Sequence, residues 1–434
     1  MAFWVLAQKF YSYARNAVIA VTASSATLGT GLLTYKVVQN DTVFVEQIKV
    51  PPAFEELGFS SDVFTKKIID NVVYLNRRTP SAKDRAKIIE NKIDLEKLDN
   101  NIAGFSVKDF VALIGEFFGK KISRISGEIT LVKDGDKTIY KVKLRKSPEQ
   151  IVLVDFEAEL SPDDLALKTA LKLIEKTDPH IAAALYQGAF RDKANSLRMI
   201  EVVLSDDNVQ NHKYTYNLLS QIHVNELKYE AAFDDLKKSL DIDPLFPATY
   251  ANLANLYASK KEFENGIDAA DKAIKFGPEA PYGYFQKGRI YRDMNDYVKA
   301  EFFLRKTIEK DRAFFAAYSS LAGLFSDQNK LEEASKWLVK GILIRPEIPN
   351  LYFSYGRILT KQKRHEEALI QYQKTLDLDR ENPEVLMAII DCYESLKNAS
   401  KKHIVLKKLQ NQYEAGAYSN QPSLEQRVRN FLKK

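Results

Sequence analysis

Two consecutive stretches of sequence decide the fold: residues 247–280 read PATYANLANLYASKKEFENGIDAADKAIKFGPEA, and residues 281–314 read PYGYFQKGRIYRDMNDYVKAEFFLRKTIEKDRAF. Each is 34 residues long, begins with proline and has tyrosine at its fourth position. The same register leads from Tyr250 and Tyr284 back to Tyr216 and on to Tyr318 and Tyr352. Self-similarity at such a period indicates a stack of repeated supersecondary units.

The second half of each unit repeats as well. A small residue, at Ala232, Gly266, Ala300, Ala334 and Ala368, follows a bulkier one by three positions. The pattern resembles the tetratricopeptide repeat family, in which paired antiparallel helices pack through small residues and aromatic side chains fill the gaps. The resemblance covers five gapless units, residues 213–382, although Arg312 and Arg380 stand where a unit usually closes with proline.

The flanks of these five units keep the unit length but not the pattern. Residues 179–212 have Tyr186 and Arg198 at the two close-packing sites, and residues 383–416 are similarly degenerate. Terminal units of a solenoid are expected to be atypical because they expose a face that inner units bury. We therefore predict a helical solenoid over 179–416 with degenerate caps, followed by a basic segment over 417–434.

Residues 42–177 lack the 34-residue repeat, and their hydrophobic pattern predicts a small α+β domain. Alternation predicts a strand over 43–50 and a three-stranded meander over 125–132, 138–144 and 151–160, with a turn at Asp134-Gly135-Asp136. Helical spacing predicts helices over 63–75 and 82–95 and one starting at Ser106. Ser161 followed by Pro162 predicts the start of a closing helix.

The amino-terminal residues 1–40 contain an uncharged stretch, residues 16–35, which is long enough for one membrane crossing. Basic flanks favour a signal anchor, and the alternatives are a cleaved signal peptide and an interfacial amphipathic helix. Lys9 and Arg15 before the stretch favour a cytoplasmic amino terminus, with the bulk of the chain periplasmic. The cytoplasmic side remains the alternative for that bulk.

A wider resemblance supports this architecture. Residues 50–58, 66–70, 106–109, 125–129 and 177–179 are similar to the amino-terminal region of predicted bacterial inner-membrane proteins that end in tetratricopeptide repeats. The resemblance implies a mainly α chain with a membrane anchor, an α+β domain and a solenoid, located at the bacterial inner membrane. It implies no reaction.

Little in the sequence points to catalysis. The five histidines, His180, His212, His223, His365 and His403, lack metal-ligand spacing, and we interpret His223 and His365 as packing residues. The single Cys392 is interpreted as a buried packing residue. We therefore expect no catalytic, cofactor or metal site; an enzyme with an unrecognised site in 42–177 remains an alternative.

The expected binding surface is the groove lined by the first helix of each unit. Its candidate residues are aromatic, cationic or amide side chains, which bind carboxylates and apolar groups well: Asn255, Tyr282, Phe285, Arg289, Arg292, Phe353 and Arg357. Tyr214, Asn217, Gln221 and Asn350 occupy equivalent positions. We predict a scaffold that binds a protein or peptide partner there, specifically an extended peptide with aromatic and acidic residues.

The formal net charge of +6 lies at the carboxyl terminus. The five units hold 26 basic and 25 acidic residues, whereas residues 401–434 hold 8 basic and 2 acidic ones. An alternative function is therefore binding of nucleic acid or another anionic polymer through this tail. The spacing of Leu424, Val428 and Phe431 instead predicts a helix that packs on the array or on a partner.

Overall fold

The computed structural model describes residues 43–79, 123–134, 137–147, 149–379, 382–416, 418 and 422–433. The chain forms two compact units: the first comprises Met1–Arg77 and Asp84–Ala182, and the second comprises Arg78–Lys83 and Ala183–Lys434. Among the helices described, none combines the length and the apolar character that a membrane crossing requires. The predicted anchor at 16–35 lies outside the described residues, as do the predicted helices at 82–95 and from Ser106.

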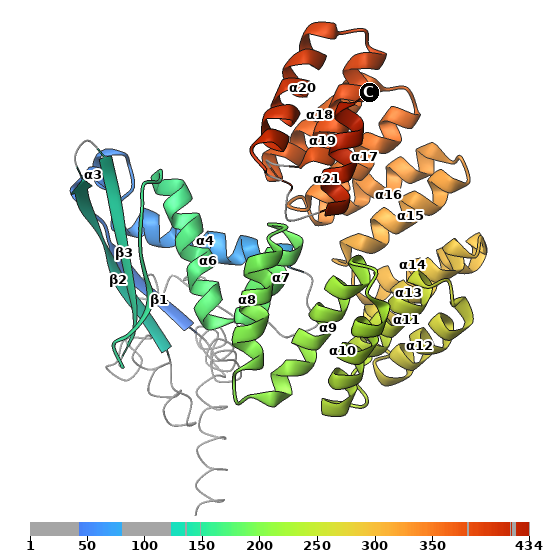
Figure 1. Cartoon of the computed structure of the whole chain (residues 1–434), viewed down its shortest axis with the longest axis horizontal. Coiled ribbons are helices and arrows are strands. Elements are labelled where there is room, and N and C mark those ends of the chain that lie inside the picture. The colour runs from blue at the N-terminus through green and yellow to red at the C-terminus, as the bar shows by residue number, and fades with distance from the viewer. Residues whose placement is uncertain are drawn as a thin grey trace, which may run out of the picture. The chain divides into compact units, whose positions relative to one another are not determined.

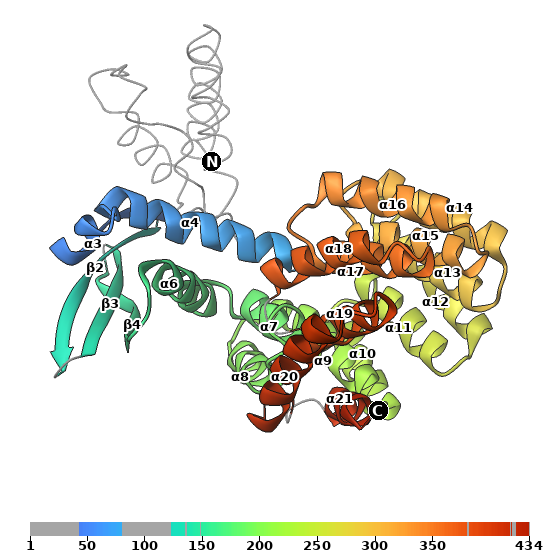
Figure 2. The same ribbon diagram turned by 90° about the horizontal axis from the view of Figure 1, so that it is seen from above.

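The first unit is a four-stranded sheet with helices against one face. In chain order its elements are β1 (Val43–Lys49), α3 (Pro52–Glu56), α4 (Ser61–Arg78), β2 (Ser123–Asp134), β3 (Lys137–Ser147), β4 (Ile151–Ala158) and α6 (Pro162–Thr177). Strand order is β1-β2-β3-β4, in which β1 pairs parallel with β2 and the other pairs are antiparallel. The helices α4 and α6 lie on the same side of the sheet (Figures 1 and 2).

The alternation of apolar and polar side chains along the strands decides which face of the sheet is buried. Tyr140, Val142 and Leu144 of β3 are buried, whereas the residues between them are partly exposed. The Phe54 ring of α3 lies 4.7 Å from the Tyr140 ring, measured between centroids. The Thr65 hydroxyl accepts a 2.8 Å hydrogen bond from the Ile48 amide, which ties β1 to α4. The opposite face carries cross-strand ion pairs such as Lys141 with Glu157.

The structure confirms the predicted strands at 43–50, 125–132, 138–144 and 151–160 to within a few residues, and the helices at 63–75 and from Ser161. The Ser161 hydroxyl caps α6 by accepting a 3.2 Å hydrogen bond from the Asp164 amide. The predicted three-stranded meander is present as β2, β3 and β4, and β1 adds a fourth, parallel strand to the sheet, which the sequence did not indicate. Pairing of β1 with β2 joins residues about 80 positions apart, and no local pattern indicates it.

The second unit is a succession of antiparallel helix pairs (Figure 1). The pairs in chain order are α7 (Pro179–Gly188) with α8 (Lys193–Leu204), α9 (Val209–Asn225) with α10 (Tyr229–Ile242), α11 (Pro247–Ser259) with α12 (Phe263–Phe276), α13 (Pro281–Asp293) with α14 (Tyr297–Lys310), α15 (Phe315–Asp327) with α16 (Leu331–Ile344), α17 (Pro349–Lys361) with α18 (His365–Leu378), and α19 (Pro383–Ser395) with α20 (Ala399–Glu414); α21 (Pro422–Leu432) follows.

The turns inside the six pairs from α9–α10 to α19–α20 have the same backbone geometry. One non-glycine residue has a positive φ, and these residues recur every 34 positions: Leu227, Lys261, Asn295, Asn329, Lys363 and Lys397. A left-handed residue lets the chain reverse after the first helix, as in helix C-terminal motifs that usually use glycine. The repeat register read from the sequence is thus present in the backbone.

Replacing Leu227 with glycine is expected to stabilise the array by about 0.5–1 kcal/mol. Leucine is strained at φ 60°, and its side chain is 71% exposed, so glycine relieves strain and loses little packing. Thermal unfolding of the purified chain measures the effect. Ile404→Gly is the control, because Ile404 is also exposed but lies inside α20, where glycine should lower the melting temperature. A lower melting temperature for Leu227→Gly would contradict the prediction.

The carboxyl-terminal helices close the core of the array. Leu386 and Ile389 of α19 are buried, and Leu424 and Val428 of α21 are buried in the same cluster. The prediction that the last segment packs is confirmed, with the array as its partner. Cys392 is fully buried, burial raises the pKa of its thiol, and its Sγ lies 3.6 Å from the Thr360 hydroxyl. The packing role inferred for Cys392 is confirmed.

Candidate functional site: the inner face of the array

The curvature of the array identifies its inner face. The first helices of successive pairs, α9, α11, α13, α15, α17 and α19, contact one another in turn. Among the described helices, the second members of neighbouring pairs make no comparable contact. Helices on the inside of a curve lie closer together than those outside, so the first helices line the concave side.

Arg289 on α13 is the most unusual side chain of this face. Its guanidinium donates hydrogen bonds of 3.0 Å to the Asn255 side chain and 3.1 Å to the Gln286 side chain. Burial lowers the pKa of Arg289. Among the described residues no carboxylate oxygen lies within 4.0 Å of it. The guanidinium also lies 5.8 Å from the centre of the Phe285 ring, and Asp293 acts on it only as a more distant charge. A half-buried cation without an ion-pair partner retains much of its attraction for an anion.

Arg292, one turn further along α13, is instead neutralised. Its Nε donates a 2.6 Å hydrogen bond to the Asp327 carboxylate at the end of α15. Its guanidinium lies against Gly323, where an added Cβ would come within 2.8 Å of it. Arg292 therefore joins α13 to α15, and Gly323 provides the space for its head group.

Helix α15 carries small side chains where its two neighbours on the inner face carry larger ones. At three equivalent positions it carries Ala316, Ser319 and Gly323, all small. The corresponding residues are Tyr282, Phe285 and Arg289 on α13, and Asn350, Phe353 and Arg357 on α17. The aromatic and cationic candidates thus lie on the two helices that flank α15.

Beyond α17 the inner face deepens into a cleft of 620 Å³. Phe353 and Arg357 of α17 line it together with Met387 of α19 and with Arg427 and Phe431 of α21. Arg357 is exposed and has no ion-pair partner among the described residues, whereas Arg427 lies 2.5 Å from Glu384. The cleft combines aromatic and apolar side chains with charged ones of both signs, since Glu384 and Asp391 also line it.

Tyr372 forms the back of this cleft from α18. Its ring centroid lies 5.9 Å from that of Phe353, and its hydroxyl lies 3.0 Å from the Thr360 hydroxyl. Burial raises the pKa of Tyr372 to about 12, so the phenol stays neutral. Tyr372, Met387 and Phe431 were not among the predicted site residues. The apolar spacing in the last segment was the one available signal for Phe431.

The remaining sequence candidates divide into two kinds. Tyr282 and Phe285 pack edge-on against Phe314, with centroid distances of 5.9 and 5.0 Å, and stay partly exposed. Asn217 is buried and donates 2.8 Å hydrogen bonds to the Ser239 and Thr249 side chains. Its inclusion among groove positions was wrong, because it serves packing between helices.

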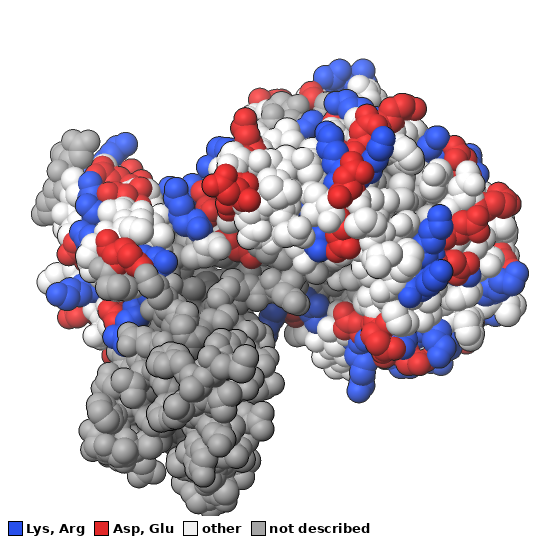
Figure 3. Space-filling model, turned by 90° about the horizontal axis from the view of Figure 1, so that it is seen from below, with Lys and Arg blue, Asp and Glu red and all other residues white. Residues whose placement is uncertain are grey.

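The surface charge of the array is mixed. On the face drawn in Figure 3, lysine and arginine alternate with aspartate and glutamate over the array without a field of one sign. Several cations of the carboxyl-terminal excess have acidic partners: Lys402 lies 3.0 Å from Glu394, and Arg429 lies 3.2 Å from Glu425. These pairs reduce the charge available to an anionic polymer, so the structure adds no support for the nucleic-acid alternative.

His223 is held by a buried acid. Its Nδ1 lies 2.7 Å from the carboxylate of Asp235, which is 3% exposed. His223 therefore packs between α9 and α10, as the sequence indicated. Among the described residues, no group of three or more histidine, cysteine or acidic side chains is arranged to hold a metal ion.

The Asp235 pair predicts a pH-dependent stability. Burial raises the pKa of Asp235, and this outweighs the opposite effect of its hydrogen bond to His223. Protonated Asp235 is favoured in the folded state, so its contribution to stability is complete below about pH 3.9, the pKa of aspartate in the unfolded chain. The contribution is lost as pH rises through the higher pKa that Asp235 has in the folded protein. Asp235→Asn should gain stability relative to the wild type as pH rises above about 4.

Urea unfolding of both proteins across this pH range measures the difference. Asp234→Asn is the matched control, since Asp234 is exposed and adjacent. Parallel pH curves for Asp235→Asn and the wild type would contradict the assignment.

Comparison with known proteins agrees with the fold. Residues 247–279, 281–313 and 349–382 match the tetratricopeptide repeat family model, and they correspond to the second, third and fifth units of the array. Together with the helix pairs and the 34-residue turn geometry, these matches show that the array contains tetratricopeptide repeats. Tetratricopeptide repeats generally mediate protein–protein interactions. No curated protein matches the chain.

Several solved structures are similar to the array. MamA shares 20% identity over 40% of this chain and 94% of its own, with a TM-score of 0.34. The pilF protein of Pseudomonas aeruginosa shares 17% sequence identity over 48% of this chain and 93% of its own, with a TM-score of 0.38. A chain of the APC/C hetero-tetramer Cut9–Hcn1 shares 17% sequence identity over 62% of this chain and 52% of its own, with a TM-score of 0.43. At these values we transfer no function from them.

Proposed function

We propose that this protein is a non-enzymatic scaffold whose inner face binds an extended segment of a partner protein. The segment would place a carboxylate against Arg289, aromatic or apolar side chains over the small residues of α15, and a second carboxylate at Arg357. The observation that carries the proposal is Arg289: a half-buried guanidinium without a carboxylate partner among the described residues. Aromatic and arginine side chains are the types that concentrate binding energy at interfaces.

Photo-crosslinking in cells tests the proposal. A benzophenone amino acid in place of Tyr282, beside Arg289 on α13, should capture a protein, and the attached peptide should contain acidic and aromatic residues. The same group in place of Val298, which is 82% exposed on α14, serves as the control and should not capture that protein. Equal capture from both positions would argue against an inner-face site.

We propose further that residues 16–35 anchor the chain in the bacterial inner membrane, with the array on the periplasmic side. The support is the uncharged stretch between Arg15 and Lys36 and the basic residues that precede it. A reporter enzyme that matures only outside the cytoplasm, fused after Lys434, should be active. An inactive reporter, with a cytoplasmic reporter active at the same position, would reverse the orientation.

A further inference from the structure

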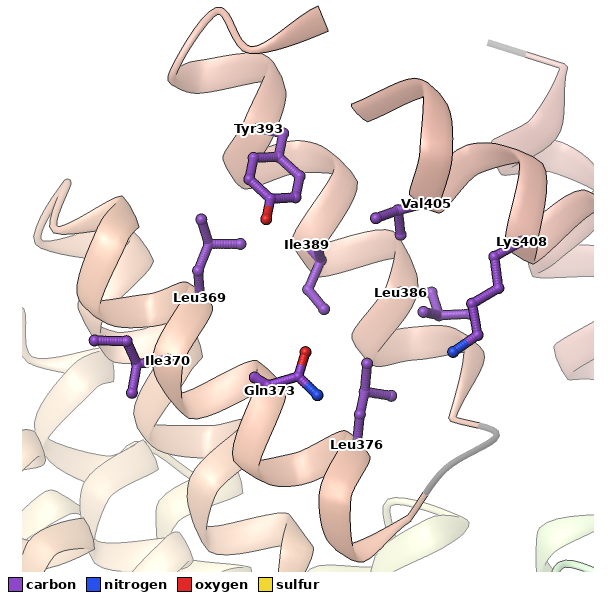
Figure 4. Close-up of a pocket in the computed structure, with 9 residues that line it drawn as sticks. All are labelled: Leu369, Ile370, Gln373, Leu376, Leu386, Ile389, Tyr393, Val405 and Lys408. Carbon is purple, nitrogen blue, oxygen red and sulfur yellow. The ribbon is translucent and has the colours of Figure 1, made fainter. Parts of the chain in front are cut away.

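A second groove lies between α18 and α20, with α19 as its floor (Figure 4). Its volume is 350 Å³, and it shares no lining residue with the cleft at Phe353 and Arg357. Its lining is apolar except for Gln373 on α18, the hydroxyl of Tyr393 on α19 and Lys408 on α20. Figure 4 shows Leu386 and Ile389 along the floor and the Lys408 ammonium directed toward the groove.

The array itself shows what fills such a groove. Between α14 and α16, two units earlier, the Trp337 ring occupies the equivalent place. The Arg305 guanidinium lies 4.9 Å and the Lys340 ammonium 4.5 Å from the centre of this ring, and the Tyr318 ring lies beside it with a centroid distance of 6.2 Å. In the groove between α12 and α14, Phe303 takes the same position, with the Lys287 ammonium 4.9 Å from its ring centre.

The 68-residue offset between the two grooves relates their residues one by one. Trp337 corresponds to Val405, Lys340 to Lys408, Arg305 to Gln373 and Tyr318 to Leu386. The groove between α18 and α20 therefore has the lysine, Lys408, but has Val405 in place of the tryptophan ring. At the same position the groove between α16 and α18 has the polar Gln371, and the groove between α10 and α12 has Ala269, so a small apolar residue replaces the ring in two of the grooves.

The rim of this groove is unusually apolar for a protein surface. Ile370 of α18, which lines the groove, is 60% exposed, whereas Leu386 and Ile389 below it are buried. Exposed apolar side chains around a concave apolar floor mark interaction sites. The cation directed toward the groove favours a ring over an aliphatic side chain, because a ring presents a negative face.

We propose that the groove between α18 and α20 receives an aromatic side chain, preferably tryptophan, presented by a partner protein. The ring would rest on Leu386 and Ile389, as the Trp337 ring rests on its own floor, with Lys408 over its face. This site is independent of the inner face and of the proposed function, so a partner could engage both faces of the array.

Binding of fluoroindole to the full chain tests the proposal with a defined probe. The broadening of the fluorine NMR line of the probe measures this binding. We expect saturable broadening that indole displaces more readily than isoamyl alcohol does. Val405→Trp, which supplies the missing ring from the chain itself, should abolish the broadening. Val298→Trp adds the same ring at an exposed position on α14 and should leave it unchanged. Lys408→Met should weaken binding about two- to fivefold.

Any one of three binding results would overturn the proposal. They are an absence of saturable broadening, equal binding to Val405→Trp and the wild type, and equal displacement by the aliphatic alcohol. Val405→Trp is expected to melt at or above the wild-type temperature, and a lower value would mean that the groove rejects a ring, which also overturns the proposal. Self-association that Val405→Trp reverses would assign the groove to a second copy of the chain instead.

Discussion

Gly356→Ala is expected to destabilise the carboxyl-terminal part of the array by about 2–3 kcal/mol. An added Cβ at Gly356 would come within 2.4 Å of a Tyr372 ring carbon. The ring cannot retreat, because it is 1% exposed and its hydroxyl lies 3.0 Å from the Thr360 hydroxyl. Overpacking of this kind forces off-rotamer side chains or a shift of α18 away from α17.

Because repeats contact only their neighbours, the effect should appear as an earlier unfolding transition of the last units, with the rest of the array melting later. Differential scanning calorimetry of the full chain measures it. Gly188→Ala is the matched control: an added Cβ at Gly188 meets no atom within 4 Å, so the melting temperature should not fall. Equal effects of the two substitutions would show that the Gly356 contact is not tight.

Arg357→Glu combined with Arg289→Gln is expected to weaken partner binding by at least about 100-fold. Each arginine is proposed to form one charge-assisted pair with the partner, worth about 1.5–3 kcal/mol. Arg357→Glu places a negative charge in the cleft that Asp391 also lines, which adds repulsion of a carboxylate. The glutamine at position 289 keeps an amide donor for Asn255 and so protects the helix contact.

Fluorescence anisotropy with a labelled peptide of alternating glutamate and phenylalanine, and then with the segment recovered by crosslinking, measures the loss. Thermal unfolding of the double variant should stay within a few degrees of the wild type. Arg364→Glu is the control for charge alone: Arg364 is exposed outside the groove, where it pairs with Glu367. Unchanged affinity of the double variant, with the control also unchanged, would remove both arginines from the site.

The repeat array could be predicted in detail because its determinants are local. Each unit carries its own helix pair, turn and small close-packing residue, so the 34-residue period places the helices almost to the residue. The four-stranded sheet was harder to predict, since the pairing of β1 with β2 depends on a distant partner and on the packing of α4 against Ile48.

The sequence predicted which helix face carries the candidate residues, but it did not predict the role of each residue on that face. The repeat register places Arg289 and Arg292 on the same inner face, but one lacks an acid within ion-pair distance and the other bonds Asp327. That difference depends on which residue the next helix presents, 35 positions away from Arg292. The wall that α21 contributes depends on a fold-back of the chain after α20, which helical periodicity alone does not specify.

Hydroxyl-radical footprinting of the full chain with its crosslinked partner tests the central claim most directly, because it reports the exposure of individual side chains. We predict protection of Phe285, Phe353 and Met387 on the first helices. Phe233 and Phe302, exposed on the second helices α10 and α14, should be modified at unchanged rates. Protection of Phe233 or Phe302 without protection of Phe285 and Phe353 would contradict binding at the inner face.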